Sequence, residues 1–318
     1  MRATAMGHSG RILKTVSSVT LLLALLLLAS CGRTTAKNTI IDAHQGKEAL
    51  VMKFLPNMPP ARVFSADPQS LQFAVQLHNN GAADLSAETL KLAIVGYDKK
   101  ILTIEPDEQD LALPARSVEN PQGTTKVATW TTTAINFPAK HDSISQSVTA
   151  RACYRYQTIA TQTICLDPKP EAQVKDKVCS PASTTLKNGQ GGPVSVVKID
   201  QALLPSVSRA QLKLTVQNLG KGEVINPDIA LDKCVAGDLQ VQDLGKVTVA
   251  ARVNEQELTC TPITLYNKQG TSYCTLDGLP DTAFTTPVVI TLSYGYTESI
   301  STTVEIVTSQ EPDSPVGS

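Results

Sequence analysis

The sequence predicts an all-β protein built as two similar β-sandwiches in tandem. Apolar residues alternate with polar or small ones at the period of two that a half-buried strand requires, as in LQFAVQL at residues 71–77. Sustained helical periodicity is missing from the sequence. Landmarks of the first half return about 140 residues later, which indicates an internal repeat. Many short strands separated by turn residues are typical of sandwiches.

The N-terminal segment predicts export from the cytoplasm. Arg2, Arg11 and Lys14 precede an apolar run, TLLLALLLL, which small residues follow. Such a run is short for a membrane-spanning helix and is typical of the apolar region of a signal peptide. We therefore expect residues 1–30 to be a signal peptide. An uncleaved signal anchor is the alternative.

The end of this run, Leu28-Ala29-Ser30-Cys31, resembles the lipobox of bacterial lipoproteins. In those proteins the cysteine receives a diacylglycerol, the peptide is cut before it, and the new amine is acylated with a chain such as palmitate. The resemblance implies that Cys31 tethers the protein to a membrane, because two or more chains anchor a protein stably. Gly32, in place of an aspartate, resembles lipoproteins that move on to an outer membrane. The expected location is the cell envelope, outside the cytoplasm.

Composition predicts an ordinary folded protein with about two domains. Apolar residues make up 42% of the chain and charged residues 18%, and 318 residues exceed a usual single core. The net charge of −1 shows no basic surplus, so a nucleic-acid partner is not expected. The expected segments are a lipidated tether at 31–45, a first β-sandwich at 46–167, a linker at 168–193, a second β-sandwich at 194–307 and a disordered tail at 308–318.

Two pairs of matching segments indicate the internal repeat. The strand that ends in Asn79-Asn80-Gly81 has a counterpart that ends in Asn218-Leu219-Gly220, and both endings favour a tight turn. Further on, Cys153-Tyr154-Arg155-Tyr156 matches Ser293-Tyr294-Gly295-Tyr296 at an offset of 140. We expect each pair of tyrosines to lie on one face of a terminal hairpin. A structural role is favoured for them over a recognition surface, because both copies hold them.

The segments QLHNNGAADL and VQNLGKGEV look like elements of immunoglobulin-like surface domains, including cell-adhesion-related domains of bacterial and archaeal envelope proteins. GKEALVMKFLPNMPP and CYRYQT also resemble prokaryotic envelope proteins with tandem domains of this kind. The resemblance implies two tandem immunoglobulin-like β-sandwiches and supplies no activity to carry over. We expect a structural or adhesion-type binding module with a protein or glycan partner at the cell surface. The alternatives are a periplasmic assembly or secretion accessory and an envelope enzyme.

Six cysteines remain besides Cys31, and an even number outside the cytoplasm predicts disulfides. They are Cys153, Cys165, Cys179, Cys234, Cys260 and Cys274. A turn near Ile159 would set Cys153 opposite Cys165, so we expect that pair first. Cys260 with Cys274 and Cys179 with Cys234 complete the expected set.

No catalytic residue, metal site or cofactor is expected. The cysteines form no C-x-x-C and the four histidines are isolated, so zinc spacing is missing. Residues 270–274, GTSYC, begin like a nucleophile elbow but lack its final glycine, and a hairpin turn is favoured. Glu105, Asp107, Glu108 and Asp110 supply oxygens that suit calcium, but an acidic surface turn is favoured because the spacing matches no calcium loop.

Two apolar features have competing interpretations. Trp130, the single tryptophan, lies in a β-rich run, and core packing is favoured over a binding platform. Met52, Phe54, Leu55 and Met58 cluster near two prolines. A buried edge strand is favoured there over an exposed contact patch.

Overall fold

The computed structural model describes residues 44–107, 111–172, 177–279 and 281–308. These residues belong to one compact unit, which spans residues 41–318. Nearly all of their regular secondary structure is strand, so the all-β prediction is confirmed. The predicted signal peptide, Cys31 and most of the tether lie outside the described residues, as does the tail from residue 309.

The first half of the chain forms a four-stranded antiparallel sheet. Its order is β1 (Leu50–Phe54), β3 (Gln72–Asn79), β6 (Thr124–Ile135) and β5 (Leu102–Pro106). β3 carries the predicted alternation, and Phe73, Val75 and Leu77 are buried. Trp130 of β6 lies opposite Phe73 and is buried in the core. β1 is an edge strand, and its Met52 is half-buried against the same core.

A second, twelve-stranded sheet takes strands from both halves. Its main path is β4 (Leu90–Val95), β7 (Ser143–Leu166), β16 (Phe284–Val307), β12 (Lys246–Val253), β13 (Gln256–Cys260), β15 (Gln269–Asp277), β10 (Arg209–Asn218), β9 (Val194–Leu204) and β8 (Thr184–Thr185). The strands off this path are β2 (Arg62–Phe64), β11 (Glu223–Ile225) and β14 (Ile263–Thr264). The described helical turns are α2 (Leu231–Ala236), η1 (Pro68–Ser70), η2 (Pro205–Val207) and η3 (Val241–Asp243).

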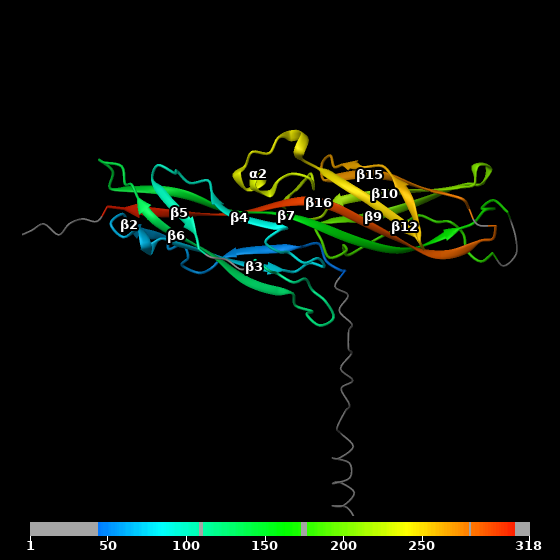
Figure 1. Cartoon of the computed structure of the whole chain (residues 1–318), viewed down its shortest axis with the longest axis horizontal. Coiled ribbons are helices and arrows are strands. Elements are labelled where there is room, and N and C mark those ends of the chain that lie inside the picture. Colours follow the sequence, from blue (N-terminus) through cyan, green and yellow to red (C-terminus); the bar gives the residue numbers. More distant parts are fainter. Residues whose placement is uncertain (1–43, 108–110, 173–176, 280, 309–318) are drawn as a thin grey trace, which may run out of the picture. The chain divides into compact units, whose positions relative to one another are not determined.

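The longest strands, β7 and β16, are antiparallel partners over 24 residues each (Figure 1). Their pairing runs from Phe284 opposite Leu166 to Val307 opposite Ser143. The expected hairpin turn near Ile159 is therefore wrong. β7 contains neither glycine nor proline, the residues that most readily break a strand, and its β-branched residues favour continued extension. The chain simply continues through Ile159.

The pairing of β7 with β16 follows the internal repeat. Arg155 and Gly295 are equivalent positions at the offset of 140, and they lie opposite each other. Tyr154 lies opposite Tyr296 in the same register. Residues related by the repeat thus exchange places across the pair, as an internal two-fold relation requires. The two halves are therefore joined through one shared pair of strands.

Four tyrosines form the centre of this shared region. Tyr154, Tyr156, Tyr294 and Tyr296 are all buried, and neighbouring ring centroids lie 5.7 to 6.3 Å apart. These separations are typical of packed aromatic pairs. The tyrosines are core residues with the structural role that the repeat suggested. They support two continuous strands, however, and no hairpin.

The six predicted disulfide cysteines form three pairs, of which one was predicted. Cys260 and Cys274, with Cα atoms 4.0 Å apart, confirm that prediction. Cys153 pairs with Cys234 and Cys165 pairs with Cys179, so the other two predicted pairings are wrong. Because β7 is continuous, Cys153 and Cys165 are separated by roughly 40 Å along an extended strand.

The segment expected to be a linker, residues 168–193, is attached to the fold. It contains β8, and Cys179 joins it to the end of β7. Its last residues, Gln190 to Pro193, are buried and lead directly into β9. The division of the chain into two separately folding sandwiches stays a prediction. The pairing of β7 with β16 matters for it, because each half of the chain contributes one of these two strands.

Candidate functional site

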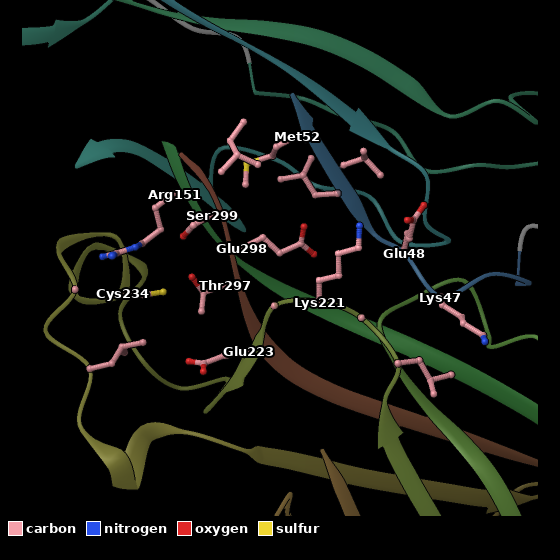
Figure 2. Close-up of a pocket in the computed structure, with 18 residues that line it drawn as sticks. Lys47, Glu48, Met52, Arg151, Lys221, Glu223, Cys234, Thr297, Glu298 and Ser299 are labelled. Atoms are coloured by element: carbon pink, nitrogen blue, oxygen red, sulfur yellow. The ribbon is translucent and has the colours of Figure 1, made fainter. Parts of the chain in front are cut away.

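A cavity of about 710 Å³ lies beside β1, the loop that follows β10, and residues 297–300 of β16. Figure 2 shows that charged side chains from several elements extend into this space. Ligand sites are commonly clefts of this size with apolar walls and a few converging polar groups. Leu50, Met52 and Ile300 supply apolar wall here. The cavity is therefore the candidate site.

Glu298 reaches the cavity because of its position on β16. Side chains two residues apart on a strand share a face, so Glu298 follows Tyr294 and Tyr296 on the face that carries the tyrosine cluster. The Tyr154 hydroxyl donates a hydrogen bond of 2.9 Å to Oε1 of Glu298. Glu298 thus joins the buried tyrosines to the cavity that it lines.

Burial raises the pKa of Glu298 to about 7. The hydrogen bond from Tyr154 and the positive charge of Lys221 both lower this pKa, whereas the negative charge of Glu48 raises it. Near neutral pH the carboxyl group therefore divides between its charged and neutral forms. Burial, with the nearby charge of Glu298, raises the pKa of Tyr154 well above its ordinary value. Tyr154 consequently remains a hydrogen-bond donor.

Charges of both signs surround the mouth of the cavity. Lys47 and Lys221 are exposed there, as are Glu48 and Glu223. Glu48 accepts a hydrogen bond of 3.0 Å from Asn80. Within the described part of the chain, neither Lys47 nor Lys221 forms an ion pair at 4 Å or less. The mouth therefore presents two ammonium groups to a ligand.

The disulfide Cys153–Cys234 holds one wall of the cavity. It joins β7 to α2, and Cys234 packs with Ile225 and Leu231 in a small apolar cluster of its own. Beside it, the Arg151 guanidinium donates a hydrogen bond of 3.1 Å to the carbonyl oxygen of Val235. Both contacts fix the 234–239 segment against β7, so this wall is preorganised.

The internal repeat places Thr158 at the position equivalent to Glu298. The Thr158 and Tyr294 hydroxyls lie 2.7 Å apart, in the same relation as Glu298 to Tyr154. Thr158 is buried, and a second cavity of about 580 Å³ near Ile159 does not include it. The pair of Glu298 and Tyr154 therefore differs from the pair of Thr158 and Tyr294 in having a carboxyl group and access to a cavity.

Two residues singled out from the sequence line the cavity, namely Cys234, which was expected to form a disulfide, and Met52 of the apolar cluster. Cys31 lies outside the described residues, as do Glu108 and Asp110. Asp107 accepts a hydrogen bond of 3.1 Å from Thr131. Residues 270–274 lie within β15, just after a turn at Asn267 and Lys268.

Sequence reasoning missed Glu298. The signal was present, because the offset of 140 aligns Glu298 with Thr158 and so marks an acidic replacement beside a shared tyrosine motif.

In the described ranges no group of three His, Cys, Asp or Glu side chains is arranged to hold a metal ion. In the same residues, no helix is both long and apolar enough to cross a membrane.

A scan against protein-family models found no match, and a search of curated proteins found none either.

Proposed function

We propose that this chain is a lipid-anchored protein of the cell envelope whose folded part is a binding module. The lipobox resemblance at Cys31 supports the anchor, with a membrane as the first partner. Three disulfide pairs support a location outside the cytoplasm, because disulfides form and persist in oxidising compartments. Gly32 after the anchor supports an outer membrane, if the cell has one.

The finer fold that we propose is a pair of immunoglobulin-like sandwiches that share their two longest strands. The similar strand orders β1-β3-β6-β5 and β9-β10-β15-β13 support two copies of one unit. Equivalent first strands pair equivalently, since Leu50 lies opposite Asn79 and Val194 lies opposite Asn218. β7 and β16 would then complete both sandwiches together.

The observation that carries the binding role is the cavity onto which Glu298 opens. A binding module needs a stable concave surface with a few oriented polar groups, and the disulfide Cys153–Cys234 and the tyrosine cluster fix the walls of this one. The partner at the cell surface would be a protein or a glycan that places a polar group on Glu298.

An envelope enzyme is the second candidate, and Glu298 is the observation that favours it. A carboxyl group with a pKa of about 7 suits general acid–base catalysis at neutral pH. We favour binding, because Tyr154, the hydrogen-bond partner of Glu298, is completely buried and cannot act on a substrate as a second catalytic group. An assembly or secretion accessory would use an open sheet edge such as β1 or β5.

Site-specific photocrosslinking in native envelopes tests the binding role. A photoreactive p-benzoylphenylalanine at position 223, at the mouth of the cavity, should yield a defined adduct. The same residue at position 257 is the matched control, because Glu257 is an exposed strand glutamate that does not line the cavity. The adduct from position 223 should disappear in Glu298→Thr. Identical adducts from both positions, or none from position 223, would contradict the proposal.

A further inference from the structure

The two copies differ in the short segment that precedes their first strand. The Asn80 amide donates to the carbonyl oxygen of Ala49, and the Leu219 amide donates to that of Pro193, each at 2.7 Å. These matching contacts make residues 47–48 equivalent to residues 191–192. The first copy has Lys-Glu where the second has Gly-Gly.

This difference closes one site and leaves the other open. A Cβ atom on Gly192 would lie 2.5 Å from the Thr158 hydroxyl, so only glycine lets the chain cover Thr158 this closely. The Val194 amide also donates a hydrogen bond of 3.3 Å to the Tyr294 hydroxyl. In the first copy, Lys47 and Glu48 line the open cavity that Glu298 faces. The half-buried carboxyl group of Glu298 and the open cavity therefore occur together in one copy.

The charges around Glu298 restrict what the cavity can hold. Lys221 is near enough to lower the pKa of Glu298, yet the two form no ion pair. The cavity is lined by Lys47, Arg151 and Lys221 and by Glu48, Glu223 and Glu298, so a ligand that carries charge of one sign meets like charges as well as opposite ones. A ligand with both charges satisfies both groups. Leu50, Met52 and Ile300 line the space between with apolar surface.

We propose that the cavity binds a zwitterionic group of the partner at the cell surface, with an ammonium group and a carboxylate on one aliphatic stem. Glu298 holds the ammonium group, Lys221 at the mouth attracts the carboxylate, and the apolar wall contacts the stem. This assignment rests on the proposed binding function and names the ligand class of the same site.

Calorimetric titration of the full chain with 6-aminohexanoate tests the assignment. Hexylamine and hexanoate are the matched probes, because each keeps the stem and one charge. The zwitterion should bind at least about tenfold more tightly than either, since each control leaves one charged group without its partner. Equal binding of hexylamine or hexanoate would overturn the assignment.

Substitutions of single residues test whether 6-aminohexanoate binds in this cavity. Glu298→Thr, which copies the residue of the other half, and Lys221→Gln should each weaken binding of 6-aminohexanoate by about tenfold or more. Glu257→Thr should leave it unchanged, and thermal melts check that every variant is folded. Binding that survives Glu298→Thr would overturn the assignment. If no probe binds while the adduct from position 223 persists, the ligand class is wrong and the binding role stands. If both fail, the binding role fails as well.

Discussion

Arg155 of β7 lies directly opposite Gly295 of β16, and the internal repeat maps one of these residues onto the other. Each long strand therefore continues past this point along the opposite half of the chain. The arrangement resembles two identical subunits that exchange a strand, here within one polypeptide. It follows that removing one half of the chain also removes a partner strand from the other half.

Fragment stability tests this strand sharing. A fragment that begins at Asn188 lacks β7, so β16 keeps β12 and β11 but loses the neighbour that pairs with it over its whole length and becomes an apolar edge strand. We expect it to show no cooperative melt by far-UV circular dichroism under oxidising conditions. A fragment that begins at Ser143 retains β7 and should melt cooperatively with a β-type spectrum. A cooperative melt from the shorter fragment would show instead that the second sandwich folds alone.

The disulfide pairs should differ in their contribution to stability. In the chain-entropy model, the Cys153–Cys234 bond closes a loop of 81 residues and is worth about 4 kcal/mol, against about 3 kcal/mol for Cys165–Cys179, which closes 14. The double variant Cys153→Ala/Cys234→Ala should therefore lower the melting temperature more than Cys165→Ala/Cys179→Ala. Non-reducing peptide mapping of the parent checks the pairing itself. A peptide that links Cys153 to Cys165 would contradict the continuous β7.

Local pattern was enough to predict the strands but not how far β7 extends. The alternation in β3 depends on one buried face and is visible in seven residues of sequence. Whether the chain turns or continues at Ile159 depends on its partner, β16, which begins more than a hundred residues later. The predicted pair Cys153–Cys165 failed for the same reason, because it depended on that turn. Glu298 was missed because it belongs to no catalytic or binding motif. It becomes noticeable only when it is compared with Thr158, the residue at the equivalent position of the repeat.

Glu298 should make the stability of the protein depend on pH. Its pKa is about 7 in the folded chain, above the ordinary value of 4.5 that applies when unfolded. The stability that this difference contributes is fully present below pH 4.5 and is lost as the pH rises through 7. We expect Glu298→Gln to raise the free energy of unfolding by about 3 kcal/mol at pH 8 and by little at pH 4.5.

Urea unfolding at several pH values measures this difference. Glu257→Gln is the control, because Glu257 is exposed on β13 and should change stability little at any pH. The glutamine at position 298 keeps an oxygen that can accept the Tyr154 hydroxyl, so packing is preserved. Equal stability of parent and Glu298→Gln across the whole range would show that this carboxyl group is not buried.

The anchor is tested by a change at the cysteine of the lipobox. Cys31→Ser removes the thiol that would receive the diacylglycerol, so the protein should move from the detergent phase to the aqueous phase or remain unprocessed. Mass spectrometry of the mature parent protein should show acyl chains on Cys31. Unchanged phase partition in the variant, together with a parent mass that lacks acyl chains, would rule out the lipid anchor.

The most direct test of the cavity as a binding site is an NMR titration of the Glu298 side-chain carboxyl carbon in the full chain, assigned by comparison with Glu298→Gln. We predict a midpoint at a pKa of about 7, because burial disfavours the charged form. Saturating 6-aminohexanoate should shift the midpoint to lower pH, since an ammonium group stabilises the carboxylate. A midpoint near the ordinary value of 4.5, unmoved by the zwitterion, would contradict the account.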